Sequence, residues 1–335
     1  MNRPQIRLAR RRLCLSLGLG LGLTAAFVPA LAMASTDAWP TKPIRFIVPY
    51  APGGLPDTVA RVLSQQLTQR LGKPVVVDNR PGANGVVAAQ ALMTSPADGY
   101  TFLVTDGSMM SINPAIYKNL SYEPKRDFVP VSLAARSPLF LAVNARVPAN
   151  SLNDFVALAK SKSGTLNYGS SGIGSTHHLS MEALKTALKL DIKHVPFRGS
   201  GQSVPALIGD QVQVVFAALP SLSGFVKSGQ VKILGTNSLK RSALAPKIPA
   251  ISEVVPGYDF AVTVGLLAAK GTSDAVVKKM ANAVSEAVNM PEVVSQFHVA
   301  GIEPVGGSSA DYARVIDDEA ARYAQTIKLA HVVAE

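Results

Sequence analysis

The chain has 335 residues, with 33 Lys or Arg against 22 Asp or Glu, a formal net charge of +11. Five of the basic residues and no acid fall within residues 1–34, so the remaining residues carry 28 bases against 22 acids, a net charge of +6. These charges are scattered, and the largest basic clusters are doublets such as Lys125-Arg126. Nucleic-acid binding needs a basic stripe, usually with aromatic residues between the charges, so nucleic acid is excluded as a partner. The residual positive charge serves either solubility or a mild attraction for anionic solutes.

Residues 1–34 have the organisation of a secretory signal peptide. Five Arg within residues 1–12 precede an apolar run at 13–31 and the small-residue site Ala32-Met33-Ala34. A membrane anchor is the alternative, since the run approaches spanning length, but Pro29 and the cleavage site end it. We expect a soluble periplasmic chain beginning at Ser35, exported by the Sec route or, as the Arg triplet at 10–12 hints, by the twin-arginine route.

Cysteine usage limits the chemistry of the exported chain. The only cysteine, Cys14, lies inside the segment to be removed. The mature chain therefore has no thiol, no disulfide and no cysteine metal ligand.

A strand-loop-helix unit recurs along the first hundred residues of the mature chain. Residues 44–48 read as a buried strand, followed by a glycine-containing loop and a helix from Asp57 to about Leu71. Residues 75–77 form the next strand, followed by a loop at 79–85 and a helix through Leu92. The third strand, 101–104, leads into the loop Thr105-Asp106-Gly107-Ser108.

The same unit returns after residue 140. A strand ending at Tyr168 leads into the loop 169–174, and Ser175 or Thr176 caps the helix that follows. Residues 192–197 are a strand leading into Arg198, and residues 212–216 are a strand leading into Ala217-Ala218.

Strands alternating with helices predict an α/β fold with parallel sheets covered on both faces. The mature length indicates two domains. Two further helices, at about 273–290 and 309–331, should return to the first domain. We therefore expect domain 1 at residues 35–138 with 262–335, and domain 2 at 139–261.

Glycines and small hydroxyls gather where helices begin. Gly53-Gly54 precede the first helix, and Gly174-Ser175 precede the helix of the second half. Glycine permits close backbone approach, and the first helical turn offers unpaired N–H groups and a positive dipole end. Such loops form an anion site without a cation, although one glycine loop alone would be only a turn. Ligands of parallel sheets bind beyond the carboxyl ends of the strands.

Enzyme signatures are missing from the sequence. The order of glycines at 169–174 fits neither a dinucleotide fingerprint nor a nucleophile elbow, and no phosphate loop occurs. His177-His178 suggest a metal, but adjacent helical side chains diverge by about 100°. We expect no metal, no cofactor and no catalysis, and one of the two histidines orienting the loop or touching a ligand.

Three charged residues have two interpretations each. Asp57 is either the N-cap of the first helix or a contact for a polar ligand group. Arg80 and Arg198 lie in loops, where either can pair with a ligand carboxylate or stay on the surface.

Five ordered motifs resemble those of the tripartite tricarboxylate transporter receptors, also called Bug receptors. They are Pro49-Tyr50-Ala51-Pro52-Gly53-Gly54 with Asp57, Ala60 and Arg61; Val75 to Ala83; Asn167-Tyr168-Gly169-Ser170 with Gly174, Ser175, His178, Leu179 and Glu182; His194 to Gly199; and Pro249 with Ile251 and Glu253. The likeness runs from about Trp39 to the C-terminus.

The resemblance implies a periplasmic solute-binding fold of the type II Venus-flytrap kind, with two α/β domains joined by a hinge. Such receptors hold a carboxylate through backbone groups, hydroxyls and ordered waters. The implied contacts are Tyr50, Gly53, Gly54, Asp57, Thr105, Ser108, Ser170, Gly174, Ser175, His178, Arg198, Ala217 and Ala218. The two alanines depart from the family, which commonly has a polar residue there, so they favour an apolar end on the ligand.

The function implied is capture of a small carboxylate, whether a di- or tricarboxylate, an amino acid or an aromatic acid, between the two domains. Its partners would be the ligand and either the membrane permease subunits of a tripartite transporter or a sensor kinase, and a monomer is expected. A periplasmic hydrolase or isomerase is the remaining alternative, opposed by the missing triad, thiol and metal set.

Overall fold

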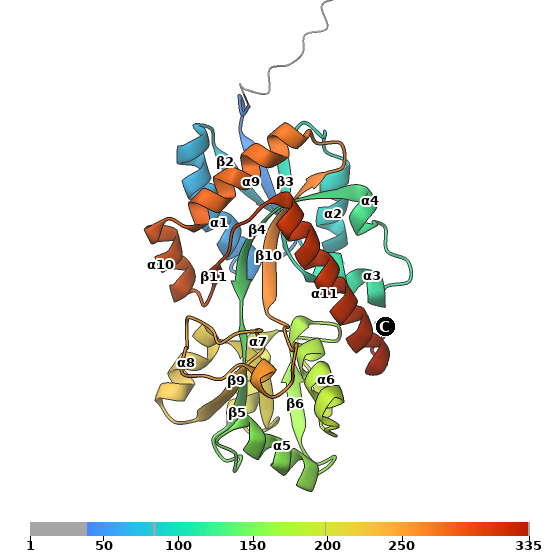
Figure 1. Cartoon of the computed structure of the whole chain (residues 1–335), viewed down its shortest axis with the longest axis vertical. Coiled ribbons are helices and arrows are strands. Elements are labelled where there is room, and N and C mark those ends of the chain that lie inside the picture. Colours follow the sequence, from blue (N-terminus) through green and yellow to red (C-terminus); the bar gives the residue numbers. More distant parts are fainter. Residues whose placement is uncertain (1–38, 83–84, 198, 334–335) are drawn as a thin grey trace, which may run out of the picture. The chain divides into compact units, whose positions relative to one another are not determined.

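A computed structural model describes residues 39–82, 85–197 and 199–333. The signal peptide expected at residues 1–34, and Arg198, lie outside these ranges. The described chain contains two β-sheets, each carrying helices on both faces (Figure 1). Among the described helices, none combines the length and the apolar character needed to cross a bilayer.

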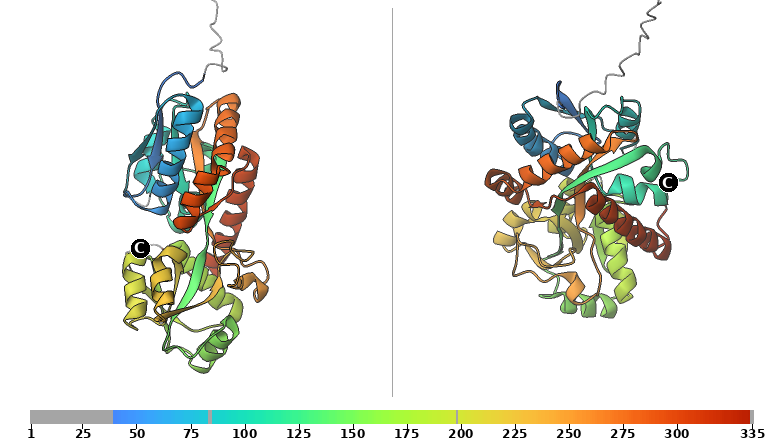
Figure 2. Two further views of the ribbon diagram at one scale, coloured as in Figure 1. Left: turned by 90° about the vertical axis from the view of Figure 1, so that its left-hand side faces the viewer. Right: turned by 45° about the horizontal axis from the view of Figure 1, so that its top comes forward.

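The first sheet has the strand order β11-β4-β10-β3-β1-β2. Its strands are β1 Ile44–Val48, β2 Val75–Asn79, β3 Thr101–Asp106, β4 Phe128–Ser137, β10 Val262–Ala269 and β11 Glu303–Pro304. The helices of this part are α1 Leu55–Leu71, α2 Val86–Met93, the π-helical η3 Ser108–Ile112, α3 Asn113–Ile116, α4 Pro124–Asp127, α9 Asp274–Val288, α10 Pro291–Val299 and α11 Ser309–Leu329. Helices α1 and α9 cover one face of this sheet, and α2 and α11 cover the other (Figure 2). Leu63 and Met280 are buried in the cluster on the first face, and Leu92 and Tyr312 in the cluster on the second.

The second sheet has the order β7-β6-β8-β5-β9. Its strands are β5 Leu139–Asn144, β6 Asn167–Ser170, β7 Lys193–Pro196, β8 Val214–Ala218 and β9 Val231–Thr236. Its helices are α5 Leu152–Ser161, α6 Thr176–Leu188, α7 Ser200–Ile208, α8 Leu219–Lys227 and the short 3₁₀ helix η4 Ile251–Glu253. Phe155 and Leu179 are buried on one face, and Leu207 and Leu222 on the other.

The sheets are mixed, which corrects the expectation of parallel sheets. β1 pairs in parallel with β2 and β3, and β6 with β7 and β8, as the strand-helix units predict. β10 pairs antiparallel with β3 and β4, β11 with β4, and β5 with β8 and β9. Parallel neighbours need a crossover connection on the same sheet. β5 and β10 each follow a segment of the other sheet, so no such crossover precedes them.

Helix α11 contributes to the cores of both sheets. Tyr312 and Ile316 lie in a cluster with residues of the first sheet, and Tyr323 and Ile327 in a cluster with residues of the second. A helix of 21 residues is about 30 Å long, so a single element packs against both.

Several element boundaries differ from those predicted. A further helix, α10, follows α9, because Pro291 ends one helical run and begins the next. Ala217 and Ala218 belong to β8 instead of the loop after it, since they pair with Phe140 and Leu139. Ser170 is likewise the last residue of β6.

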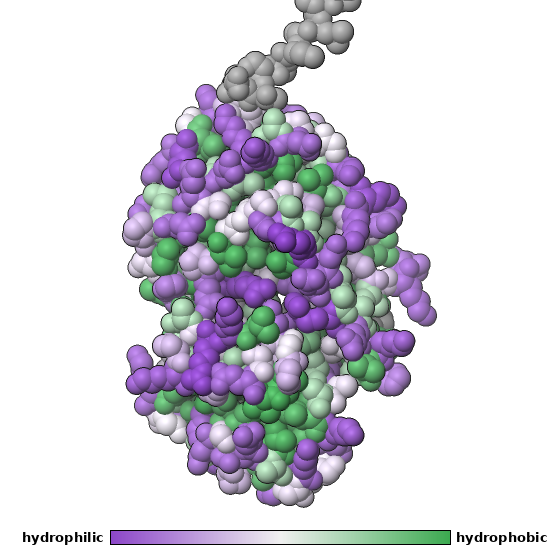
Figure 3. Space-filling model, viewed as in Figure 1, coloured by the Kyte–Doolittle hydropathy of each residue, from purple (hydrophilic) through white to green (hydrophobic). Residues whose placement is uncertain are grey.

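Hydrophilic residues are spread over the face of the molecule drawn in Figure 3. They do not gather into one stripe on that face.

A substitution at Gly265 tests how tightly β10 packs against α11. A Cβ added there would overlap the ring of Tyr312, which is 1% exposed. We expect Gly265→Ala to lower the free energy of unfolding by about 1–3 kcal/mol, because overpacked cores shift their neighbours. Urea unfolding measures it.

The matched control is Gly224→Ala in α8, where no atom lies within 4 Å of the added Cβ. It should leave stability unchanged or raise it by about 0.5–1 kcal/mol. Equal urea midpoints for the two variants would contradict this account of the core.

Candidate functional site

A buried carboxylate holds the loop between β1 and α1. Asp57 is 2% exposed and lies in the first turn of α1. Its Oδ2 accepts hydrogen bonds from the N–H of Gly53 and from Nε of Arg61, both at 2.8 Å. Its Oδ1 accepts from Nδ2 of Asn79 at 2.8 Å. The residue is not the N-cap, because Gly54 occupies that position and Asp57 reaches back to the loop from the third position of the helix.

The charge of Asp57 is stabilised by these donors. Burial alone raises the pKa of the carboxyl, but the hydrogen bonds from Arg61, Gly53 and Asn79 outweigh it and lower the pKa below its usual value. Asn79, the last residue of β2, also donates to the backbone oxygen of Tyr50 at 2.9 Å. The end of β2 therefore fixes both ends of this loop.

A second acid lies where β3 ends. Oδ1 of Asp106 accepts from the hydroxyl of Tyr50 at 2.9 Å and from the N–H of Ser108 at 3.0 Å. The hydroxyl of Thr105, which is fully buried, donates to the backbone oxygen of Asp106 at 3.3 Å. Tyr50, Thr105 and Ser108, which the sequence analysis named as ligand contacts, thus all bond to Asp106, which it did not name.

The loop between β6 and α6 is closed by Ser175. This residue is the N-cap of α6, as expected, and its Oγ accepts from the N–H of His178 at 3.2 Å. The same hydroxyl donates to the backbone oxygen of Gly172 at 2.7 Å. The N–H of Gly174 donates to Nδ1 of His178 at 3.0 Å, so the neutral ring carries its proton on Nε2.

The two glycine loops share one arrangement. In each, a glycine N–H just before the helix donates to the side chain four residues later: Gly53 to Asp57, and Gly174 to His178. Both glycines have positive φ, +89° and +74°, which side chains rarely adopt. Gly54, in contrast, has φ −73° and ψ 167°, a conformation open to any residue.

Three stacked rings lie behind the second loop. The rings of Tyr168 and His194 are 4.7 Å apart, and those of His194 and His178 are 4.0 Å apart with an interplanar angle of 9°. Nε2 of His194 lies 2.6 Å from Oγ of Ser170, which is fully buried. The hydroxyl of Tyr168 donates to Glu182 at 2.5 Å.

The three histidines near the second loop, His177, His178 and His194, are neutral at physiological pH. Burial lowers the pKa of His178 to about 4, and the Lys185 ammonium contributes; burial also lowers the pKa of His177 and of His194 to about 4. Within the described residues there is no group of three or more His, Cys, Asp or Glu that could hold a metal ion. His178 orients its loop, one of the two roles expected for this pair.

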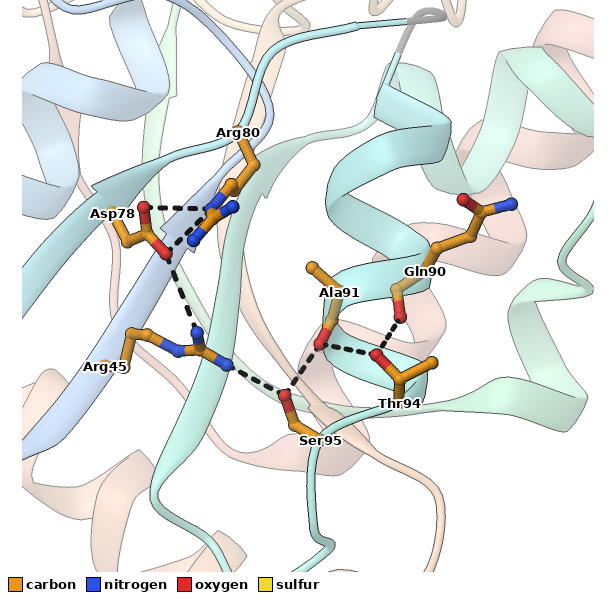
Figure 4. A network of polar contacts seen from close by, with 7 residues as sticks. All are labelled: Arg45, Asp78, Arg80, Gln90, Ala91, Thr94 and Ser95. Carbon is orange, nitrogen blue, oxygen red and sulfur yellow. Dashed lines mark hydrogen bonds and ion pairs between the residues drawn. The ribbon is translucent and has the colours of Figure 1, made fainter.

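Arg80 already has a partner at the surface. Its Nε lies 3.0 Å from a carboxylate oxygen of Asp78, whose carboxylate is also 3.7 Å from Arg45. Arg45 donates in turn to Ser95 at 2.9 Å (Figure 4). The structure thus favours the surface interpretation of Arg80.

The sequence-selected residues form two connected groups. Tyr50, Gly53, Asp57, Thr105 and Ser108 join at the carboxyl edge of the first sheet, and Ser170, Gly174, Ser175 and His178 at that of the second. The groups approach each other at Gly174, where an added Cβ would lie 2.7 Å from Cδ1 of Ile116 on α3. Ala217 is buried in β8, and Ala218 precedes α8.

Sequence reasoning missed Asn79, Asp106 and His194 as site residues. Asn79 and Asp106 each end a parallel strand, the position where the ligand rule places functional groups. That signal was present in the sequence. The stacking of His194 on His178 depends on the pairing of β6 with β7 and carries no local signal.

Comparison with known proteins identifies the family. The profile of the tripartite tricarboxylate transporter family receptor matches residues 59–331. The chain belongs to this receptor family. It is 35% identical over 299 residues to a UPF0065 protein of Bordetella pertussis, covering 88% of this chain and 92% of the relative. These are binding proteins, so the receptor is a solute-binding protein and not an enzyme.

Solved structures of receptors share the fold. Rpa4515 of R. palustris with adipate is 32% identical, with a TM-score of 0.77 and coverage of 88% of this chain and 99% of the other. MatC of Rhodopseudomonas palustris with bound malate is 28% identical, with a TM-score of 0.72 and coverage of 86% and 100%. The periplasmic binding protein BugD is 27% identical, with a TM-score of 0.73 and coverage of 89% and 100%.

His178 should make stability depend on pH. Its folded pKa, about 4, lies below the unfolded value near 6.5, so the unfolded chain binds more protons between these values. The stability that His178 contributes is complete above about pH 6.5 and is lost as the pH falls toward 4. We expect His178→Phe to cost about 1–3 kcal/mol at pH 8, because the buried N–H of Gly174 loses its acceptor, and to cost less at pH 5.

Urea midpoints of wild type and variant at several pH values measure this difference. Because both proteins share the other titrating groups, the contribution of those groups cancels when the two midpoints are subtracted. His298→Gln is the control, because His298 is exposed on α10. Parallel curves for wild type and His178→Phe would refute the role given to the imidazole.

Proposed function

We propose that this receptor captures a small carboxylate in the bacterial periplasm and delivers it to a tripartite tricarboxylate-type transporter. The observation that carries the proposal is the shared arrangement of the two glycine loops. Each loop is fixed by a side chain one turn into the helix it precedes. Fixed loops present the remaining N–H groups of the first helical turns to an anion. The relatives solved with adipate and malate bind ligands of this chemistry.

The hydroxyls and the imidazole act mainly by holding the loops. The single O–H of Ser175 donates to Gly172, and Ser170 is paired with His194. Asp57 and His178 accept the loop amides. The proposed ligand contacts are therefore main-chain donors around Gly54 and at the start of α6. The family resemblance adds Arg198, Ala217 and Ala218 to the proposed contacts.

The two sheets correspond to two domains in this proposal, residues 35–138 with 262–335 and residues 139–261. The chain passes between them at Pro138 and Ala261, where a hinge would bring the loop groups together on a ligand. Mass spectrometry of an acid that co-purifies with the protein tests the capture itself. Recovery of the acid chemically changed after incubation with pure protein would overturn it.

A substitution at Gly54 distinguishes an effect on ligand binding from an effect on folding. An added Cβ there would meet nothing nearer than 3.6 Å, so Gly54→Val should melt within a few degrees of wild type without ligand. It should weaken carboxylate binding at least about 10- to 150-fold, the equivalent of one lost hydrogen bond of 1.5–3 kcal/mol to a charged group.

Titration calorimetry with the co-purifying acid, or with adipate and malate, measures the affinity. Gly224→Ala is the control and should bind as wild type does. Normal binding by Gly54→Val would show that the ligand does not bind at this loop.

Export is tested by the mature terminus. Secretion predicts that the protein recovered from the periplasm begins at Ser35. Edman sequencing of that fraction reads the terminus directly. Protein that stays in the membrane with residues 1–34 attached would show that this segment is a membrane anchor and not a signal peptide.

A further inference from the structure

Asp106 is a carboxylate without a cationic partner among the site residues. It is the last residue of β3, and its side chain is only partly buried. Within the described residues, no Lys, Arg or His nitrogen lies within 4.0 Å of its oxygens. Asp57 and Asp259, by contrast, each have an Arg within that distance.

The two hydrogen bonds to Asp106 do not require a charge. The hydroxyl of Tyr50 and the N–H of Ser108 both donate to Oδ1. The amide oxygen of an asparagine would accept the same two bonds. Burial raises the pKa of Asp106, and the bonds from Tyr50 and Ser108 oppose the rise. What a carboxylate adds over an amide here is a negative charge and a second oxygen.

That charge lies next to the proposed anion site. β3 pairs directly with β1, so Asp106 ends beside the loop that follows β1. One network joins the two, because Tyr50 bonds to Asp106 through its hydroxyl and to Asn79 through its backbone oxygen, and Asn79 bonds to Asp57. A plain carboxylate bound here would be repelled by Asp106.

We propose that the ligand is an amino acid, whose ammonium group pairs with Asp106 while its carboxylate meets the main-chain donors at the start of α1. This inference rests on the proposed function and narrows its substrate class. The ammonium supplies the counter-charge that the described residues lack, and a charged hydrogen bond is stronger than a neutral one. The same group turns repulsion of the ligand into attraction.

Matched pairs of acids test the ammonium. The probes are L-aspartate and succinate, L-glutamate and glutarate, L-alanine and propionate, and L-phenylalanine and 3-phenylpropionate, with adipate and malate as further plain acids. Thermal shift on the full mature protein finds the binders, and calorimetry measures their affinities. We expect at least one amino acid to bind at least about 10-fold more tightly than its desamino partner.

Asp106→Asn then tests the residue. It should weaken binding of that amino acid about 10- to 150-fold, the range of one charged hydrogen bond, and leave the desamino partner unchanged or improved. Its melting temperature without ligand should stay near that of wild type, because the amide keeps both acceptor bonds. Asp317→Asn, in an exposed ion pair with Lys125, should bind as wild type does.

The outcomes separate this inference from the function on which it rests. Tight binding of plain acids with no gain from the ammonium, or an unchanged preference in Asp106→Asn, overturns the amino-acid ligand and leaves carboxylate capture standing. Binding of none of the probes overturns the amino-acid ligand, while an acid found by co-purification would still support capture.

Discussion

The continuity of β4 into β5 is the constraint on which the rest of the structure depends. Only Pro138 separates the last residue of one strand from the first of the next, so one extended segment enters both sheets. It sets the antiparallel pairing of β5 with β8 and β9, which in turn leaves β6 and β7 to form the parallel side. The glycine loop before α6 lies on that side, just as the loop before α1 lies on the parallel side of the first sheet.

Parallel strands place the loops, but side chains make them rigid. A loop amide that donates to a buried acceptor one turn into the following helix cannot turn away without leaving a buried group unpaired, at a cost of about 1–3 kcal/mol. Asp57 and His178 do this with different chemistry, one charged and one neutral. The charged acceptor has Arg61 and Asn79 as further partners, whereas the neutral one is supported by stacking on His194.

Local sequence patterns predicted the α/β class, β1, the end of α1, α2, and the capping of α6 by Ser175 or Thr176, of which the structure has Ser175, because these follow from periodicity and cap chemistry within one segment. They failed where partners distant in sequence decide. The antiparallel strands depend on connections between sheets, and the strand position of Ala217 and Ala218 depends on β5. Likewise the sequence left Asp57 open between an N-cap and a ligand contact, and its bond from Asn79 on another strand could not be read from the local pattern. The apolar stripe of α11 does not reveal which core each of its residues meets.

The described cations near the glycine loops are neutralised before any ligand arrives. Arg61 is paired with Asp57, and Arg80 with Asp78, while the histidines of the second loop are uncharged. Attraction for an anion must therefore come from oriented N–H dipoles, which act only at short range and in fixed geometry. In such a site a single carboxylate without a cationic partner has a large effect on selectivity, because little net positive charge lies nearby to offset its negative charge. Asp106 occupies that position, and its charge therefore discriminates between ligands that carry a compensating ammonium and those that do not.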